Sequence, residues 1–335
     1  MVDRSNEMAR EPTTYFAATH DGWRLALHRY PVPGAPTVLV CPGYGCNRFF
    51  VDFDARYSLA RFFASFGLDS WVVELRGRGA SYPSGQCRSP DWWTFDDLAL
   101  VDVPAVLSFV RGEVGHERMV WVGHSMGGML LYAYLSAAGE EGPKPLGGVT
   151  LASPVVFPPV ASEAARYLGQ FFLSLPIGSR VPQRQVLGAL WRLVGWTRAV
   201  EIGMNPANTD LDAAGEALRK ALTNVSRGKL RQLAHWSMTG RFASADGTLD
   251  YRAGLRRVAL PFLVCAGAAD RLATVEAVGR GFELLGSPEK EFVVFSKDAG
   301  FSADYGHVDL VFGHRVREEV FPLLVDWITQ AVGRC

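Results

Sequence analysis

A serine flanked by glycines, in the run Gly123–Gly128 with the sequence GHSMGG, is the first feature of this 335-residue chain that points to chemistry. The pattern Gly-x-Ser-x-Gly is short enough to arise by chance, so its setting matters. The apolar run Met119–Val122 precedes it and the helical run Met126–Ala138 follows it. A sharp turn from a strand into a helix exposes a serine hydroxyl for attack on a carbonyl carbon. We predict that Ser125 is a nucleophile; the alternative is a glycine-rich turn with an incidental serine.

A serine hydroxyl is a weak nucleophile until a base takes its proton, and histidine is the usual base. Three of the seven histidines follow Ser125 in the chain: His235, His307 and His314. We favour His307, because it lies in a turn-like loop after the apolar run Glu291–Phe295, and such loops hold the sites of open α/β sheets. His314, which is closer to the last helical run, is the alternative base.

The acid that orients the histidine ring is expected at the end of a neighbouring strand. Asp270 meets this requirement, since it follows the apolar run Phe262–Cys265 and gives the chain order serine, acid, histidine. Three other carboxylates are rivals because they lie near His307 in the sequence, although such residues more often fix a local turn: Asp298, Asp304 and Asp309.

Acyl transfer also needs hydrogen-bond donors for the negatively charged oxygen of the tetrahedral intermediate. We predict that two backbone N–H groups supply them. One belongs to Met126, directly after the nucleophile, and the other to Tyr44, in the glycine-containing loop Cys41–Gly45. The alternative for this loop is a simple turn between its two glycines.

Short apolar runs alternate with helical patterns along the chain, and an opening β-hairpin precedes them. The hairpin is expected from Thr13–Thr19 and Trp23–Tyr30, joined by Asp21-Gly22. Buried parallel strands are expected at Val38–Cys41, Trp71–Leu75, Met119–Val122, Val149–Leu151, Phe262–Cys265 and Glu291–Phe295. Helices are expected at Tyr57–Phe66, Phe95–Val110, Met126–Ala138, Val275–Leu285 and Val316–Gln330. The fold class is therefore α/β, a mostly parallel sheet with helices on both faces.

The stretch 154–254 interrupts this alternation, because it has helical patterns and several prolines but no strand-like run. We predict a helical cap, inserted between two parts of one core at residues 13–153 and 255–332. A cap over a cleft places apolar side chains around the substrate. The cap residues expected to bind substrate are Phe157, Trp191, Trp196, His235 and Trp236, although packing of the cap onto the body is the simpler explanation for any one of them.

The composition excludes several classes of protein. The 34 Lys and Arg residues balance 34 Asp and Glu residues, so no positive field favours nucleic acid. No stretch supplies the ~20 apolar residues that cross a bilayer, and no integral membrane association is expected. Met1–Glu11 lacks the apolar segment of a secretory signal, which favours a cytoplasmic protein. The five scattered cysteines lack metal-binding spacing, so we expect reduced thiols and no metal site. The chemistry expected of Ser125, His307 and Asp270 implies no cofactor.

With these residues assembled, the chain resembles the α/β-hydrolase superfamily of serine hydrolases from about Thr13 to Gln330. The run Glu74–Ser81, ELRGRGAS, resembles the superfamily's loop after the next strand. Tyr305–Gly313, YGHVDLVFG, is similar to the histidine region of acid lipases and, less closely, of polyhydroxyalkanoate synthases. Leu233–Ser237, LAHWS, followed by GRF, resembles the acid lipase cap.

Some positions depart from these families. Acid lipases carry His-Gly where this chain has Pro42-Gly43, and they are secretory or lysosomal. The synthases use a cysteine nucleophile, and haloalkane dehalogenases and epoxide hydrolases an aspartate, where this chain has Ser125. The resemblance therefore favours the acid lipase or esterase-like branch.

Together these features predict a serine carboxyl-ester hydrolase that cleaves medium- or long-chain acyl esters through an acyl-enzyme on Ser125. Its partner is expected to be a small-molecule acyl ester. Two alternatives stay open. One is an acyltransferase or thioesterase that uses the same residues, and the other is a hydrolase-fold binding or sensor protein with slow or no turnover.

Overall fold

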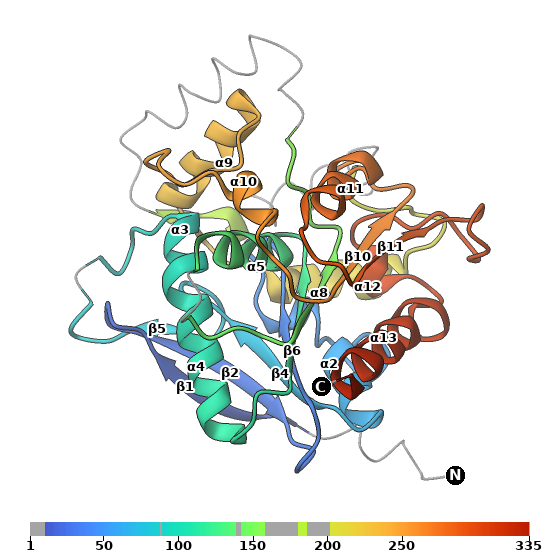
Figure 1. Cartoon of the computed structure of the whole chain (residues 1–335), viewed down its shortest axis with the longest axis horizontal. Coiled ribbons are helices and arrows are strands. Elements are labelled where there is room, and N and C mark those ends of the chain that lie inside the picture. The colour runs from blue at the N-terminus through green and yellow to red at the C-terminus, as the bar shows by residue number, and fades with distance from the viewer. Residues whose placement is uncertain (1–10, 88, 139–141, 158–179, 186–201, 335) are drawn as a thin grey trace.

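A nine-stranded sheet forms the centre of the molecule, flanked by helices (Figure 1). The computed structural model describes residues 11–87, 89–138, 142–157, 180–185 and 202–334. The strands of this sheet are β1 (Thr13–Ala18), β2 (Trp23–Tyr30), β3 (Thr37–Cys41), β4 (Asp69–Glu74), β5 (Tyr82–Pro83), β6 (Met119–His124), β7 (Gly147–Leu151), β10 (Phe262–Gly267) and β11 (Lys290–Phe295). Their order is β1-β2-β4-β3-β6-β7-β10-β11, with β5 paired to β2.

The sheet is parallel from β4 to β11 and antiparallel at the end that contains the opening hairpin. Every residue of β3, β4, β6, β7 and β10 is buried, as continuous apolar runs predict for strands covered on both faces. Between β1 and β2, Gly22 takes a φ of +96°, which L side chains rarely adopt. The predicted α/β class and the hairpin are confirmed.

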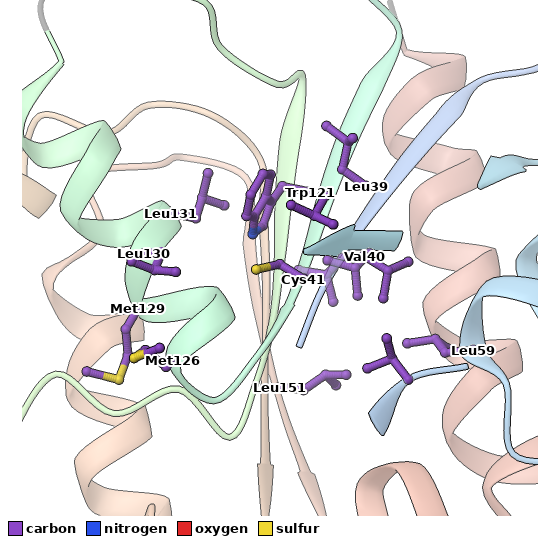
Figure 2. Packing of buried hydrophobic residues seen from close by; sticks show 14 of the residues in the cluster. Leu39, Val40, Cys41, Leu59, Trp121, Met126, Met129, Leu130, Leu131 and Leu151 are labelled. Atoms are coloured by element: carbon purple, nitrogen blue, oxygen red, sulfur yellow. The ribbon is translucent and has the colours of Figure 1, made fainter. Parts of the chain in front are cut away.

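Helices cover both faces of the sheet. On one face lie α4 (Val103–Val114), α5 (Met126–Ala137) and α11 (Val275–Leu284), and on the other lie α2 (Leu59–Ser65) and α13 (Phe321–Gly333) (Figure 1). Figure 2 shows Leu130 and Leu131 of α5 on one side of the strands and Leu59 of α2 on the other. All three side chains are buried, so one apolar core holds the strands in place.

Several expected helices have different ends. Ser58 caps α2 by accepting a hydrogen bond from Arg61 N, so the helix begins two residues after the expected Tyr57. The expected helix 95–110 is a continuous run of α3 (Phe95–Asp97), the π-helical turn η2 (Leu98–Asp102) and α4. A second π-helical turn, η4 (Val316–Val320), precedes α13. A π-turn adds one residue to a single turn without ending the helix, so the apolar runs predicted the helices but not these turns.

The described residues of the expected cap include the helices α8 (Leu211–Ala221), α9 (Arg227–Thr239) and α10 (Tyr251–Leu255). The stretch also contains a short strand pair that the sequence did not indicate, because β8 (Arg180–Val181) pairs antiparallel with β9 (Val225–Ser226). Two-residue strands are too short to form a periodic pattern. Residues 158–179 and 186–201 lie outside the described residues, and the division into cap and core stays a prediction. Within the described ranges, no helix has the length and apolar character to cross a bilayer.

A buried ion pair ties the loop after β4 to the helical layer. Arg76 donates through Nε and Nη2 to Asp102 Oδ1 at 2.9 and 2.7 Å, and its backbone N–H donates to Asp102 Oδ2 at 3.0 Å. Its Nη1 donates to Asp21 Oδ2 at 2.7 Å, in the hairpin turn. Arg76 and Asp102 are both buried, so each charge depends on the other for compensation.

We expect Asp102→Asn to lower the free energy of unfolding by about 3–5 kcal/mol, because it leaves the buried Arg76 charge without its main counter-ion. Urea denaturation followed by circular dichroism measures this change. Asp298→Asn is the matched control, since Asp298 is exposed, and its effect is expected to stay within about 0.5 kcal/mol. Equal denaturation midpoints for the two variants would contradict the stabilising role of the pair.

Candidate active site

Ser125 lies at the turn between β6 and α5 with φ 53° and ψ −120°, a strained conformation for a residue with a side chain. Hydrogen bonds hold its backbone there. Ser125 N donates to Leu151 O at 2.7 Å, and Ser153 Oγ donates to Ser125 O at 2.8 Å. The side chain is half-buried, and its hydroxyl makes no hydrogen bond to any residue that the structure describes. The turn therefore presents an accessible hydroxyl on a fixed backbone.

The glycines around Ser125 are required by close backbone contacts. A Cβ at Gly123 would lie 2.3 Å from the carbonyl carbon of Gly127, and one at Gly127 would lie 2.2 Å from the carbonyl oxygen of Cys41. Both distances are shorter than any real Cβ contact, and the atoms they meet are backbone atoms. The Gly-x-Ser-x-Gly pattern is thus the steric condition for this turn beside β3.

Two of the other predicted residues are joined directly. Asp270 follows β10 and His307 lies in the loop after β11, and His307 Nδ1 is 2.7 Å from Asp270 Oδ2. The other carboxylate oxygen, Oδ1, accepts from Leu272 N and Ala273 N at 2.8 Å each. A carboxylate that accepts on both oxygens assigns the proton of the histidine ring to Nδ1. His307 Nε2 is then left with a lone pair that can accept a proton.

The rival residues have other partners. His314 is exposed, and Asp298 is exposed in the loop before His307. Asp304 Oδ1 accepts from Lys297 N at 2.9 Å. Asp309 is buried and accepts from Asn205 N at 3.2 Å and from Asn208 Nδ2 at 2.8 Å, which ties the histidine loop to the chain before α8. Among the four aspartates considered, Asp270 is the one bonded to His307.

His124, next to Ser125, is a residue whose role the sequence did not suggest. Its Nε2 is 2.9 Å from the carbonyl oxygen of His307, and the two rings pack edge to face with centroids 4.8 Å apart. Because a carbonyl only accepts, Nε2 carries the proton. Burial, with the nearby His307, lowers the pKa of His124 to about 3, so the ring is neutral at ordinary pH. His124 thus links the serine turn to the histidine loop through a hydrogen bond, and its ring stays neutral at ordinary pH.

The two predicted oxyanion donors lie on loops that meet at the serine. Met126 is the first residue of α5, where an N–H has no acceptor within its own helix. Tyr44 lies in the turn after β3, and a Cβ on the preceding Gly43 would come within 3.2 Å of Ser125 Cβ. Neither N–H donates to a backbone carbonyl in the part of the chain that the structure describes. Their role as oxyanion donors stays a prediction.

The structure describes three of the five predicted substrate residues of the cap: Phe157, His235 and Trp236. Trp236 is fully buried and packs in an aromatic cluster with Phe95, Phe157 and Phe242, while its Nε1 donates to Ala243 O at 2.8 Å. His235, its neighbour, is exposed. The role of Phe157, His235 and Trp236 in substrate binding stays a prediction. Trp191 and Trp196 lie outside the described residues.

In the described part of the chain, no group of three or more His, Cys, Asp or Glu side chains is placed to hold a metal ion. The catalytic roles expected for Ser125, Asp270 and His307, and for the backbone N–H groups of Tyr44 and Met126, stay predictions.

Comparison with known proteins identifies the family of this chain. A family model described as serine aminopeptidase, S33, matches residues 37–298, which include Ser125 and Asp270. Lipase member M of Homo sapiens is 24% identical over 372 aligned positions, which cover 96% of this chain and 84% of that protein.

Solved structures agree on the fold. An esterase from Exiguobacterium antarcticum has a TM-score of 0.63 at 16% identity and covers 95% of this chain and 100% of that one. A monoacylglycerol lipase from Paleococcus ferrophilus has a TM-score of 0.62 at 16% identity, with 92% and 99% covered. The predicted resemblance to esterase-like and lipase-like α/β hydrolases is confirmed. The chain belongs to the serine aminopeptidase S33 family, within the α/β-hydrolase superfamily.

Proposed function

We propose that this protein is a serine carboxyl-ester hydrolase that cleaves medium- or long-chain acyl esters. The observation that carries the proposal is the hydrogen bond between His307 Nδ1 and Asp270 Oδ2, in a loop that packs through His124 against the turn bearing Ser125. This arrangement orients the His307 ring, and His124 joins the loop of His307 to the turn that bears the Ser125 hydroxyl. The similarity to lipase member M over 96% of the chain supports an ester as the substrate.

In the proposed first step, Ser125 Oγ attacks the ester carbonyl carbon while His307 Nε2 takes the hydroxyl proton. The carbon–oxygen bond to the alcohol then breaks, and the leaving alcohol receives that proton from His307. The product is an acyl-enzyme on Ser125. Asp270 keeps the ring oriented and stabilises the positive charge that forms on it.

In the second step, His307 takes a proton from water, and the resulting hydroxide attacks the acyl carbonyl. The bond to Ser125 Oγ breaks, the proton returns to that oxygen, and the free acid leaves. In both steps the carbonyl oxygen becomes negative, and the N–H groups of Tyr44 and Met126 are proposed to bind it. Each such donor contributes about 2.7–4 kcal/mol to stabilisation of the transition state.

The acyl preference rests on the aromatic residues of the cap. Phe157 is half-buried beside Trp236, so apolar surface is available at the junction of cap and body. An apolar lining favours a hydrocarbon chain in proportion to the area it buries. The activity is therefore proposed to rise with acyl length to an optimum.

Replacement of Ser125 by alanine is expected to lower kcat for p-nitrophenyl esters by about 10⁴-fold or more, because no other group can form the acyl-enzyme. The measurement is hydrolysis of the series from acetate to palmitate by wild type and Ser125→Ala. Circular dichroism of the variant checks that its fold is intact.

Other outcomes separate the alternatives. Faster release of acyl product with added alcohol would indicate an acyltransferase, and a preference for acyl thioesters a thioesterase. Turnover of amino-acid p-nitroanilides in place of esters would favour peptidase chemistry. Tight ester binding without turnover by folded wild type would indicate a sensor and would contradict the proposal.

The histidine assignment has a test of its own. His307→Ala is expected to lower kcat by about 10³-fold or more, whereas His314→Ala, at an exposed position, is expected to retain the wild-type rate. Asp270→Asn is expected to reduce kcat strongly, because the amide would favour the wrong proton position on the ring. A severe loss in His314→Ala with a normal rate in His307→Ala would refute the assignment.

A small change at Gly43 tests the proposed oxyanion loop. The added Cβ of Gly43→Ala would lie 3.2 Å from both Ser125 Cβ and His124 Nδ1, so the loop must move by a few tenths of an ångström. We expect kcat to fall about 10- to 100-fold with a smaller change in KM, because displaced donors bind the transition state less well. Gly85→Ala is the control, since a Cβ there meets no atom within 4 Å. Equal kcat values for the two variants would remove this loop from the mechanism.

A further inference from the structure

Arg78 is a buried cation with an unpaired edge. Its side chain is only 2% exposed. Nη1 donates to the carbonyl oxygen of Pro42 at 3.1 Å, but Nε and Nη2 have no hydrogen-bond partner among the described residues. Arginine keeps its proton in proteins, so the charge persists despite burial. Nε and Nη2 form one edge of the guanidinium, the arrangement that binds a carboxylate or phosphate through two parallel hydrogen bonds.

Lys229 of α9 brings a second buried cation to the same place. It is 2% exposed, and its Nζ lies 4.5 Å from the centroid of the Tyr44 ring. Within the described ranges it forms no ion pair. Burial lowers the pKa of Lys229 well below its usual value, and the charge of Arg78 lowers it further. Arg78 and Lys229 thus contact the same loop from different parts of the chain, Arg78 at Pro42 and Lys229 at Tyr44.

The neighbouring carboxylates do not neutralise this pair. Glu74, the last residue of β4, binds His28 Nε2 at 3.0 Å and the backbone N–H groups of Arg48 and Ala80. Asp102 is bonded to Arg76 through both oxygens. Arg76 and Arg78 therefore differ sharply: the former has its anions within the protein, and the latter has none in the described chain. A buried charge without a counter-ion is strongly destabilising.

We propose that Arg78 and Lys229 form a binding site for an oxyanion, a carboxylate or a phosphate, beside the loop 42–46. Arg78 Nε and Nη2 would donate to its two oxygens, and Lys229 Nζ would donate from the cap. Binding relieves the repulsion between the cations and satisfies the unpaired N–H groups.

The site adjoins the proposed active site. Pro42, whose carbonyl binds Arg78, precedes Gly43, and a Cβ on Gly43 would come within 3.2 Å of Ser125 Cβ. The anion therefore has two sources, an anionic group of the ester itself or a free small anion. The first source rests on the proposed ester hydrolysis, whereas the second does not.

Anion binding is tested first without catalysis. Inorganic phosphate and succinate are titrated against wild type, Lys229→Met and the double variant Arg78→Gln/Lys229→Met, with sodium chloride at matched ionic strength. We expect a rise in Tm of about 1–3 °C in wild type and none in the double variant. Arg24→Gln, which removes an exposed cation, is the control and is expected to respond like wild type.

If the double variant does not fold, isothermal titration calorimetry compares Lys229→Met with wild type. We expect Lys229→Met to bind phosphate or succinate about tenfold or more weakly than wild type does. Equal responses in all variants would place the binding elsewhere and overturn the proposal. No binding of either anion to wild type would also overturn it, and would mean that water alone satisfies Arg78.

Matched esters then identify the source of the anion. Monomethyl and dimethyl adipate differ by one carboxylate on the acyl side, and 4-carboxyphenyl and 4-carbamoylphenyl butyrate differ on the alcohol side. If the anion belongs to the substrate, we expect kcat/KM for one anionic ester to be about tenfold higher than kcat/KM for its neutral partner. In Lys229→Met, the ratio of these two kcat/KM values is expected to fall toward one. Phosphate binding without such a preference identifies a free anion. Hydrolysis of p-nitrophenyl esters that requires Ser125, without anion binding, refutes the anion site while the ester proposal stands.

Discussion

The close approach of Gly127 to the carbonyl of Cys41 is the constraint on which the site depends. It presses the start of α5 against the end of β3 and leaves no room for a Cβ at Gly123 or Gly127. Ser125 is thereby held at a positive φ, and the hydrogen bonds from Ser125 N and to Ser125 O keep it there. Such strain persists because the surrounding sheet and helix leave no alternative.

The parallel sheet brings the other parts to this point. β3, β6, β10 and β11 run in the same direction, so the loops that carry Tyr44, Ser125, Asp270 and His307 all leave from one edge. His124 holds the histidine loop against the serine turn by donating a hydrogen bond to the His307 carbonyl. Asp309 secures the same loop from the other side through Asn205 and Asn208. A histidine base is useful only when its ring is held in this way, because a proton transfer requires a fixed geometry.

The loop after β4 shows how two arginines two residues apart acquire different roles. Arg76 points to Asp102 and Asp21 and joins layers of the fold. Arg78 points to the loop 42–46, which Lys229 of α9 also contacts at the Tyr44 ring. In the sequence both belong to one run of alternating arginines and glycines. They differ because different elements pack around them. A buried charge with a counter-ion in the protein can stabilise the fold, whereas Arg78, which lacks one among the described residues, can bind an anionic ligand.

The sequence by itself determined the α/β class, the hairpin and the turn at Ser125, because these depend on local patterns: apolar runs, Asp21-Gly22 and the glycines beside the serine. It also narrowed the base to His307 or His314 and the acid to four aspartates. The tertiary structure decided which aspartate meets His307, since a hydrogen bond between residues far apart in the chain has no local signal. For the same reason the π-helical turns, the β8–β9 pair, the contact of His124 with His307 and the unpaired charge of Arg78 became visible only once the strands and helices were packed together.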